Sequence, residues 1–263
     1  MDKVRVVIGK EWSEVFRNRL VLFSVAFLPV LFTAMPLLIL NGMGSSVDIG
    51  SEIPFDGPEQ FTTVCENLTG GECMQYFLAS QFLILYLILP IMIPVTIASY
   101  SIVGEKTTRT LEPVLATPIT NLELLAGKAL SAVIPALIAT WGGFAIFVVG
   151  LVLLDVSPAV LNQLLSPVWL GAVFIIGGLL SISAVSLAVM VSSRVSDPRA
   201  AEQISALVVL PVVAIFVGQI IGLFYINEQI IFWMALGLGA VDIALVYIAT
   251  QLFQRETILT RWK

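Results

Sequence analysis

Long apolar stretches separated by short polar ones run along most of this sequence. Six of the apolar runs are each long enough to cross a hydrocarbon core as a helix, which takes about 20 residues. They lie at about 20–40, 78–103, 129–154, 167–193, 203–225 and 230–252. Transmembrane strands would be shorter and would alternate between apolar and polar positions. The pattern therefore predicts an all-α integral membrane protein in which residues 1–263 form a single domain with six transmembrane helices.

A second kind of apolar pattern, with a helical period, precedes the first span. Its apolar positions are Val4, Val7, Ile8, Trp12, Val15 and Phe16. Lys10, Glu14 and Arg17 fall on the other side. An amphipathic helix of this kind is expected to lie along the inner membrane surface with its Trp at headgroup level. The simplest role for such a helix is that of a membrane anchor.

The basic residues predict which way the chain faces. Lys and Arg near span ends resist translocation and collect on the cytoplasmic side. All 13 of them fall in segments that six spans place on one side, whereas the opposite segments carry acidic residues and no basic ones. Both termini are therefore expected in the cytoplasm. The composition, 58% hydrophobic and 12% charged, agrees with a membrane protein, and the net charge of −5 gives no indication of nucleic-acid binding.

The loop between the second and third spans, "GEKTTRTLEPVLATPITNLELLAGK" at 104–128, is unusually polar for this chain. Thr110 is a suitable N-cap for a short helix, and Glu112 would lie beside its positive end. Thr120 and Glu123 have the spacing of a capping box, which would begin the helix that becomes the third span. A short capped helix between two spans suits docking on a partner, although a solvated connector stiffened by its caps would have the same sequence pattern.

This loop resembles the one that follows the second span in ABC-2 type transporter permeases. The matching residues are Glu105, Thr110, Leu111, Glu112, Leu115, Ala116, Thr117, Pro118, Glu123, Gly127 and Lys128. The stretch "SSRVSDPRAAEQISALVVLP" is similar to the connection between the fourth and fifth spans of that family, so the resemblance covers nearly the whole chain. Arg109 stands where the family usually has Gly, and Pro113 where a polar residue is usual, which leaves the start of the short helix open.

The resemblance implies a permease subunit that forms the transmembrane pathway of an exporter in the cell membrane of a prokaryote. A separate cytoplasmic ABC ATPase would bind ATP and Mg, and a second permease, identical or related, would complete the unit. The short helix would rest in a cleft of the ATPase, and the N-terminal helix would connect to the same partner. The coupling residues would be Glu105, Arg109, Thr110, Leu111, Glu112, Val114 and Leu115.

The chain itself is expected to be non-catalytic and to bind no cofactor and no metal. It has no G-x-x-x-x-G-K-[ST] phosphate loop. It has no His, which removes Ser-His hydrolysis and His-ligated zinc or haem. The alternative is an ATP-independent secondary transporter or channel, which would normally need more buried ionisable groups than this sequence has in its spans.

Few polar residues lie within the spans. Asp242 is the only clear ionisable one, and because a charge at the bilayer centre costs roughly 2.5 to 3.5 kcal/mol it should face protein or water. It could contact a substrate, or it could be protonated and hydrogen-bonded to another span. Gln81 and Gln219 are weaker candidates of the same kind. Gly218 and Gly222 form G-x-x-x-G, which permits close helix approach, and the resemblance places them near the contact between two permeases.

The outer loop from Asn41 to Gln75 holds the only two cysteines, Cys65 and Cys73. Outside the cytoplasm a disulfide between them is plausible. It would close the small loop "CENLTGGEC". A thiol metal site is less expected because no third ligand is evident.

Prolines recur inside the predicted spans, at Pro29, Pro36, Pro90, Pro94, Pro135 and Pro211. Each can bend its span and free backbone carbonyls, which would help helices that must move. Prolines are common in membrane helices, however, so their number does not identify a moving part.

Overall fold

The computed structural model describes residues 2–44, 58, 61, 65, 68–108 and 119–252, which form helices and their connections without any strand. The helices are α1 (Asp2–Val15), α2 (Arg19–Gly44), α4 (Gly70–Tyr86), α5 (Leu89–Thr107), α7 (Asn121–Leu153), α8 (Pro158–Leu164), α9 (Pro167–Leu170), α10 (Gly177–Arg194), α11 (Pro198–Ser205), α12 (Leu210–Ile220) and α13 (Glu228–Leu252). Two short segments have other helical geometries, the π-helical η1 (Gly171–Ile176) and the 3₁₀-helical η2 (Ala206–Val209).

Six helical segments in the described part of the chain are long and apolar enough to cross a membrane. They are Val21–Gly42, Gly70–Thr107, Leu122–Leu153, Pro167–Arg194, Pro198–Ile220 and Glu228–Leu252. The predicted all-α fold with six transmembrane helices is therefore confirmed. The largest boundary difference is in the second span, which begins eight residues before the predicted 78, because Thr69 and Glu72 form a capping box that starts α4 inside the expected outer loop.

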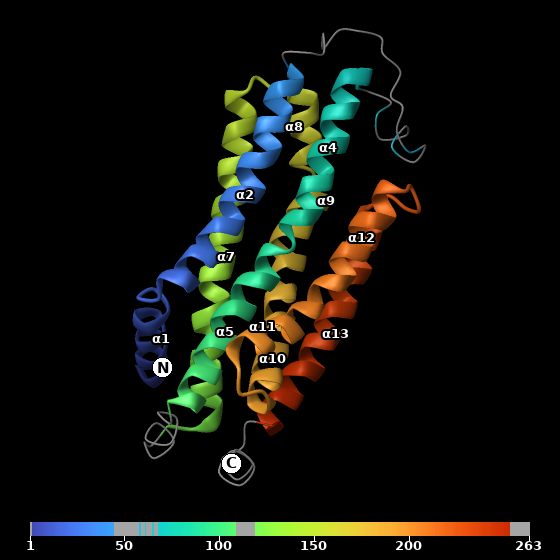
Figure 1. Ribbon diagram of the computed structural model, residues 1–263. Helices are drawn as coiled ribbons and strands as arrows, with labels where there is room; N and C mark the ends of the chain where they lie inside the picture. The colour runs from blue at the N-terminus through green and yellow to red at the C-terminus, as the bar shows by residue number, and fades with distance from the viewer. Residues whose placement is uncertain are drawn as a thin grey trace.

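The helices form one elongated bundle with the second span at its centre (Figure 1). Within that span, 72% of the most apolar window is buried, compared with 12% in the first span and 11% in the sixth. The peripheral helices α2 and α13 present large apolar side chains outward, among them Phe23, Leu38 and Ile243. An apolar outer face is expected of helices that contact lipid, because lipid tails are as apolar as the side chains.

Only two of the six span prolines coincide with an interruption of the helix. Pro90 lies in the first turn of α5, after α4 has ended, and Pro211 lies in the first turn of α12, after η2. A proline in a first turn costs little because its missing N–H would have no partner there. The other four, Pro29, Pro36, Pro94 and Pro135, lie inside helices that continue through them.

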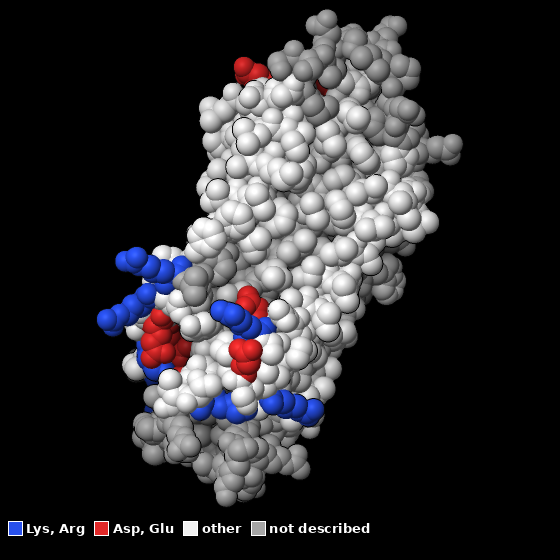
Figure 2. Space-filling model, viewed as in Figure 1, with Lys and Arg blue, Asp and Glu red and all other residues white. Residues whose placement is uncertain are grey.

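On the face drawn in Figure 2 the charged residues gather at the two ends of the bundle; Asp242, buried within the sixth span, is an exception. One end, here called the basic end, carries α1, the end of α5, the start of α7 and the junction of α10 with α11 (Figure 1). Its Lys and Arg residues include Lys3, Arg5, Lys10, Lys106, Lys128, Arg194 and Arg199. The opposite end, here called the acidic end, carries Glu72, Asp155 and Glu228. The basic residues thus gather on one side, as the orientation prediction requires; the cytoplasmic location of that side stays a prediction.

Candidate functional site at the basic end

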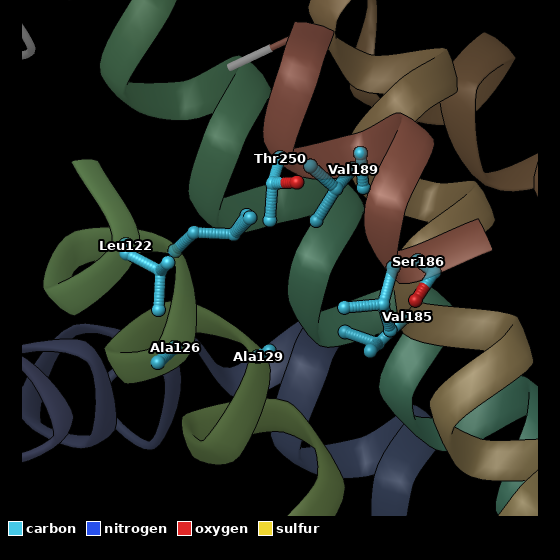
Figure 3. A pocket seen from close by; sticks show the side chains of 10 residues that line it. Leu122, Ala126, Ala129, Val185, Ser186, Val189 and Thr250 are labelled. Atoms are coloured by element: carbon cyan, nitrogen blue, oxygen red, sulfur yellow. The ribbon is translucent and has the colours of Figure 1, made fainter. Parts of the chain in front are cut away.

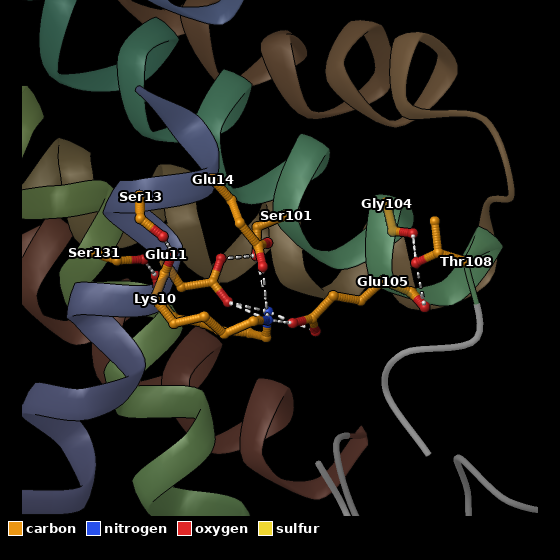
Figure 4. Close-up of polar contacts among 10 residues, drawn as sticks. Lys10, Glu11, Ser13, Glu14, Ser101, Gly104, Glu105, Thr108 and Ser131 are labelled. Carbon is orange, nitrogen blue, oxygen red and sulfur yellow. Dashed lines mark hydrogen bonds and ion pairs between the residues drawn. The ribbon is translucent and has the colours of Figure 1, made fainter. Parts of the chain in front are cut away.

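Three helices meet around a buried lysine at the basic end. Lys128 of α7 is 3% exposed, and its Nζ lies 2.8 Å from Glu11 Oε1 of α1 and 2.7 Å from Glu105 Oε2 of α5. The same Nζ donates a hydrogen bond to Ser101 Oγ at 2.8 Å. Figure 4 shows the carboxylates of Glu11 and Glu105 pointing toward each other from α1 and α5. One ammonium group therefore joins two buried carboxylates that belong to different helices.

A second lysine completes the arrangement. Lys10 of α1 forms an ion pair with the other oxygen of Glu105, and its Nζ lies 3.7 Å from Glu11 Oε1 and 3.5 Å from Glu14 Oε1. Ser101 donates a hydrogen bond to Glu11 Oε2. We call Lys10, Glu11, Ser101, Glu105 and Lys128 the ion cluster. Its two cations and two anions balance, which is what a buried group of charges requires.

The electrostatics of the ion cluster favour the charged forms of Glu11 and Lys10. Burial alone would raise the pKa of Glu11, but the charge and hydrogen bond of Lys128 and the hydrogen bond from Ser101 hold that pKa below its ordinary value. Burial opposes the charge of Lys10, yet the hydrogen bond and charge of Glu105 raise the pKa of Lys10. Such a cluster does not make a protein more stable than an apolar core would, but it fixes how three helices fit together.

The helix α1 is held on α7 by further contacts. Val7 packs directly over Gly127, where a β-carbon would lie 2.7 Å from Val7 Cγ1, so only glycine fits. The Trp12 indole N–H donates to the Ser131 carbonyl oxygen at 3.0 Å. Packing against α7 thus occupies the indole N–H that the sequence pattern assigned to the membrane surface. The interfacial position of α1 itself stays a prediction.

The predicted coupling loop begins and ends beside the ion cluster. Six of its predicted contact residues lie outside the described residues: Arg109, Thr110, Leu111, Glu112, Val114 and Leu115. On the N-terminal side, Lys106 Nζ donates to the carbonyl oxygens of Ser193 and Val195, both at 3.3 Å, at the end of α10. On the C-terminal side, Thr120 and Glu123 form the predicted capping box that begins α7. Both flanks of 109–118 are therefore anchored to packed helices.

A cleft of about 310 Å³ lies against the ion cluster, immediately before residue 109. Its lining includes Glu11, Glu14, Tyr100, Ser101, Glu105 and Thr108. Glu105, which the sequence assigned to contact with an ATPase, is only 5% exposed and has both oxygens paired with lysines. Of the three carboxylates in this lining, Glu14 is the exposed one, at 55%.

The sequence profile described as ABC-2 family transporter protein matches residues 5–231. The chain belongs to the ABC-2 transporter family. No curated protein matches it. The matched region includes the whole ion cluster, the loop 109–118 and the first five spans, so the resemblance seen in the sequence is confirmed, and this ABC-2 protein is a multi-pass transmembrane permease.

Three polar residues predicted inside the spans of this ABC-2 permease are buried. Asp242 of α13 is 5% exposed and accepts a hydrogen bond from Ser183 of α10, so it faces protein, as the energetic argument required. Its Oδ2 has no hydrogen-bond partner among the described residues, and the same holds for the side-chain amides of Gln81 and Gln219. Whether any of them contacts a substrate stays a prediction.

Gly218 and Gly222 do not form the continuous small-residue face that their spacing suggested. The helix α12 ends at Ile220, and Gly222 has a φ of 72°, a left-handed conformation that favours glycine. The Leu223 N–H returns to the Gly218 carbonyl at 2.8 Å, and the ring of Phe224 covers Gly218. The two glycines therefore belong to the turn that ends α12. Their predicted place at a contact between two permeases stays a prediction, and the helix geometry does not support it.

The acidic end contains the two cysteines. Cys65 and Cys73 are joined by a disulfide, with Cα atoms 5.4 Å apart. Close to it lies an aromatic group that sequence reasoning missed. The ring of Phe61 is fully buried and packs edge-on to the ring of Tyr225, with 5.2 Å between the ring centroids. The hydroxyl oxygens of Tyr76 and Tyr225 lie 2.6 Å apart. The indole N–H of Trp169 donates a hydrogen bond to the Tyr76 hydroxyl at 3.2 Å.

An apolar pocket of about 120 Å³ opens between α7, α10 and α13 at the basic end (Figure 3). Leu122, Ala126 and Ala129 line it from α7, facing Val185 and Val189 of α10. Ligand pockets in proteins usually exceed about 300 Å³. This one is too small and too apolar to be a transport pathway by itself.

Sequence reasoning also missed Glu11, although a signal for it was present. Glu11 lies four residues after Val7 and four before Val15, which places it within the apolar stripe of α1. All three are buried. A carboxylate on the apolar side of an amphipathic helix needs a cation from elsewhere in the protein, and Lys128 supplies it.

Proposed function

We propose that this permease is the membrane subunit of an ATP-driven exporter and that a separate ABC ATPase docks on the loop 109–118 at the basic end. The observation that carries the proposal is the ion cluster. Through it, the residue that leads into the loop, Glu105, is tied to α1 and to α7 by buried ion pairs. A partner that moves the loop would therefore move three helices together.

Within this proposal the residues divide into two roles. Glu105 anchors the base of the loop, because its carboxylate is buried and already paired. The direct contacts with the ATPase come from Leu111, Val114 and Leu115, with Arg109, Thr110 and Glu112 supplying polar contacts. ATP and Mg bind to the ATPase, and the permease itself is non-catalytic. Two permeases complete the unit, with the basic end and both termini in the cytoplasm of a prokaryotic cell.

The test is co-purification of candidate ABC ATPases with the tagged permease, together with ATP hydrolysis by the complex. The variant Leu111→Asp plus Glu112→Lys should lose the ATPase and the hydrolysis that the permease stimulates. The matched control makes the same changes at the acidic end, Leu223→Asp plus Glu228→Lys, where both residues are exposed, and should retain both.

The proposal is wrong if the loop variant keeps the full complex and full stimulated hydrolysis. It is equally wrong if no ABC ATPase binds the wild-type permease and the purified chain alone conducts ions in liposomes, which is the behaviour of the channel alternative.

A further inference from the structure

Three of the six spans change their backbone geometry partway across. In the second span α4 ends at Tyr86 and α5 begins at Leu89, and the N–H groups of Leu87 and Ile88 donate to the carbonyls three residues earlier, both at 3.0 Å. In the fourth span the π-helical η1 separates α9 from α10. In the fifth span the 3₁₀-helical η2 separates α11 from α12.

These interruptions lie beside one another. A β-carbon on Gly177, the residue that follows η1, would lie 3.6 Å from Pro90 Cγ at the start of α5. The segment η2 also packs against α5. The second, fourth and fifth spans therefore leave regular α-helical geometry around one point of the bundle, which we call the hinge level.

The interrupted spans pack on different neighbours on the two sides of the hinge level. The helix α4 packs on α8 and α12, whereas α5 packs on α10, α11 and α7; the continuous helix α2 packs on both α4 and α5. Polar contacts follow the same division, since Trp169 of α9 bonds to Tyr76 of α4, and Thr96 of α5 donates to Glu202 Oε1 of α11 at 2.6 Å. In each interrupted span, one half therefore contacts α4 and the other half contacts α5. We call α4, α9 and α12 the acidic half, and α5, α10 and α11 the basic half.

The hinge level is filled with apolar side chains. Leu87 is 3% exposed, and Leu89 and Ile176 are fully buried. Interrupted helices at membrane depth are tolerated only where protein or a water-filled cavity surrounds them, and here protein does so. A dry, packed interruption suits bending more than ligand binding. Short π-helical turns, moreover, occur frequently at functional sites.

We propose that the hinge level is where this permease bends during transport, with the basic half turning against the acidic half. The continuous helix α7 runs past the hinge level, whereas α4 with α5, α9 with α10, and α11 with α12 flex there. The basic half carries Glu105 and so moves with the ion cluster. The hinge proposal does not depend on which partner moves the basic half. It can therefore be tested separately from the proposal that an ATPase docks on the loop 109–118.

The first test removes the interruption in the second span. Pro90→Ala supplies an N–H that can donate to the Tyr86 carbonyl and join α4 to α5. Its matched control is Pro94→Ala, which changes a proline inside the continuous part of α5. We expect Pro90→Ala to raise the thermal midpoint and to lose most of the ATP hydrolysis stimulated in the complex, and Pro94→Ala to keep that hydrolysis. A Pro90→Ala permease that is more stable and equally active would overturn the hinge.

The second test needs no ATPase and remains decisive if Pro90→Ala folds poorly in cells. Spin labels at Met74→Cys and Tyr100→Cys, two exposed positions on α4 and α5, measure a distance across the hinge level in lipid nanodiscs. A control pair at Leu130→Cys and Leu153→Cys lies on the continuous helix α7. The labels spare the native disulfide, whose sulfurs are not free thiols.

The distance distribution across the hinge level should be broad, and broader than that of the α7 pair. A second substitution on the labelled chain, Pro90→Ala or Gly177→Leu, should narrow this distance distribution. The control Gly178→Leu should leave its width unchanged, because nothing lies within 4 Å of a β-carbon added at that position. A distribution as narrow as the α7 control overturns the proposal. A broad distribution in a permease that binds no ATPase would keep the hinge and remove the proposed function instead.

Discussion

The two ends of this permease are held together by different chemistry. At the basic end, α1, α5 and α7 meet through buried ion pairs among Glu11, Glu105 and Lys128. At the acidic end, α4, α9 and the connection from α12 to α13 meet through aromatic rings and hydroxyl groups. A disulfide also joins Cys65 to Cys73 of α4. The basic end therefore depends on matched charges and the acidic end on apolar packing and a covalent bond.

This difference predicts how strongly each end responds to the loss of a single side chain. Removing one member of a buried ion pair leaves an uncompensated charge, which costs far more than losing one contact from an apolar cluster. The ion cluster is thus a strict geometric constraint beside the loop that is proposed to receive an ATPase. Apolar packing allows more sliding of side chains than ion pairs do, because the hydrophobic effect is not directional. Mutations should expose this asymmetry between the ends.

The largest effect is expected from Lys128→Met. Loss of its ammonium leaves Glu11 and Glu105 buried with only the partly exposed Lys10 as a cation, and breaking a buried pair in this way typically costs about 3 to 5 kcal/mol. We expect a strongly reduced yield of folded protein and a lowered thermal midpoint in detergent, measured by size-exclusion chromatography after heating.

Two further variants sharpen that result. Lys128→Met combined with Glu11→Gln removes one charge of each sign and should recover part of the lost stability. Lys3→Met removes a more exposed lysine of α1, one whose Nζ lies 3.8 Å from Glu123, and should cost less than about 1 kcal/mol. If Lys128→Met is no worse than Lys3→Met, the ion cluster does not hold the basic end together.

A smaller effect is expected at the acidic end from Cys73→Ser. The disulfide spans eight positions, and closure of so short a loop contributes about 2.5 kcal/mol in the chain-entropy account. The variant should have a moderately lower thermal midpoint. Intact cells that carry the wild-type permease should label with a membrane-impermeant thiol reagent only after reduction, because the disulfide leaves no free thiol.

Strong labelling of wild-type cells without reductant would show that Cys65 and Cys73 are free. The acidic end would then depend on apolar packing and hydrogen bonds alone, without a covalent bond. Ser157→Ala, a substitution of the N-cap residue of α8 at the same end, is a control that keeps both cysteines and should leave the labelling unchanged.

The sequence predicted the parts of this molecule that local chemistry decides. The spans follow from apolar run length, because a bilayer accepts few other structures. The start of α7 follows from Thr120 and Glu123, which bond to each other three residues apart. The start of α4 was available in the same way from Thr69 and Glu72 but lay among polar residues that suggested a loop.

Other features could not be predicted because they depend on residues far apart in the chain. Glu11 and Lys128 are separated by 117 positions, and no local pattern names one as the partner of the other. The G-x-x-x-G reading of Gly218 and Gly222 assumed a helix that continues, whereas Phe224 folds back over Gly218. The breaks at η1 and η2 likewise lie among helices that are distant in the chain, since η1 packs against α7 and α13 and η2 packs against α5.

The smallest effect is expected at Asp242, which belongs to neither end. It accepts one hydrogen bond, from Ser183, and hydrogen bonds between membrane helices contribute about 0.6 kcal/mol on average. Asp242→Asn keeps the shape and the acceptor, so folding and stimulated ATP hydrolysis should stay normal, whereas Asp242→Leu should lower the thermal midpoint slightly, to the same extent as Ser183→Ala. If Asp242→Asn instead abolishes hydrolysis at normal abundance, the carboxylate acts in transport and not only in joining α13 to α10. If Asp242→Leu matches wild type in both measurements, the hydrogen bond to Ser183 contributes nothing, and burial of this residue has no mechanistic consequence.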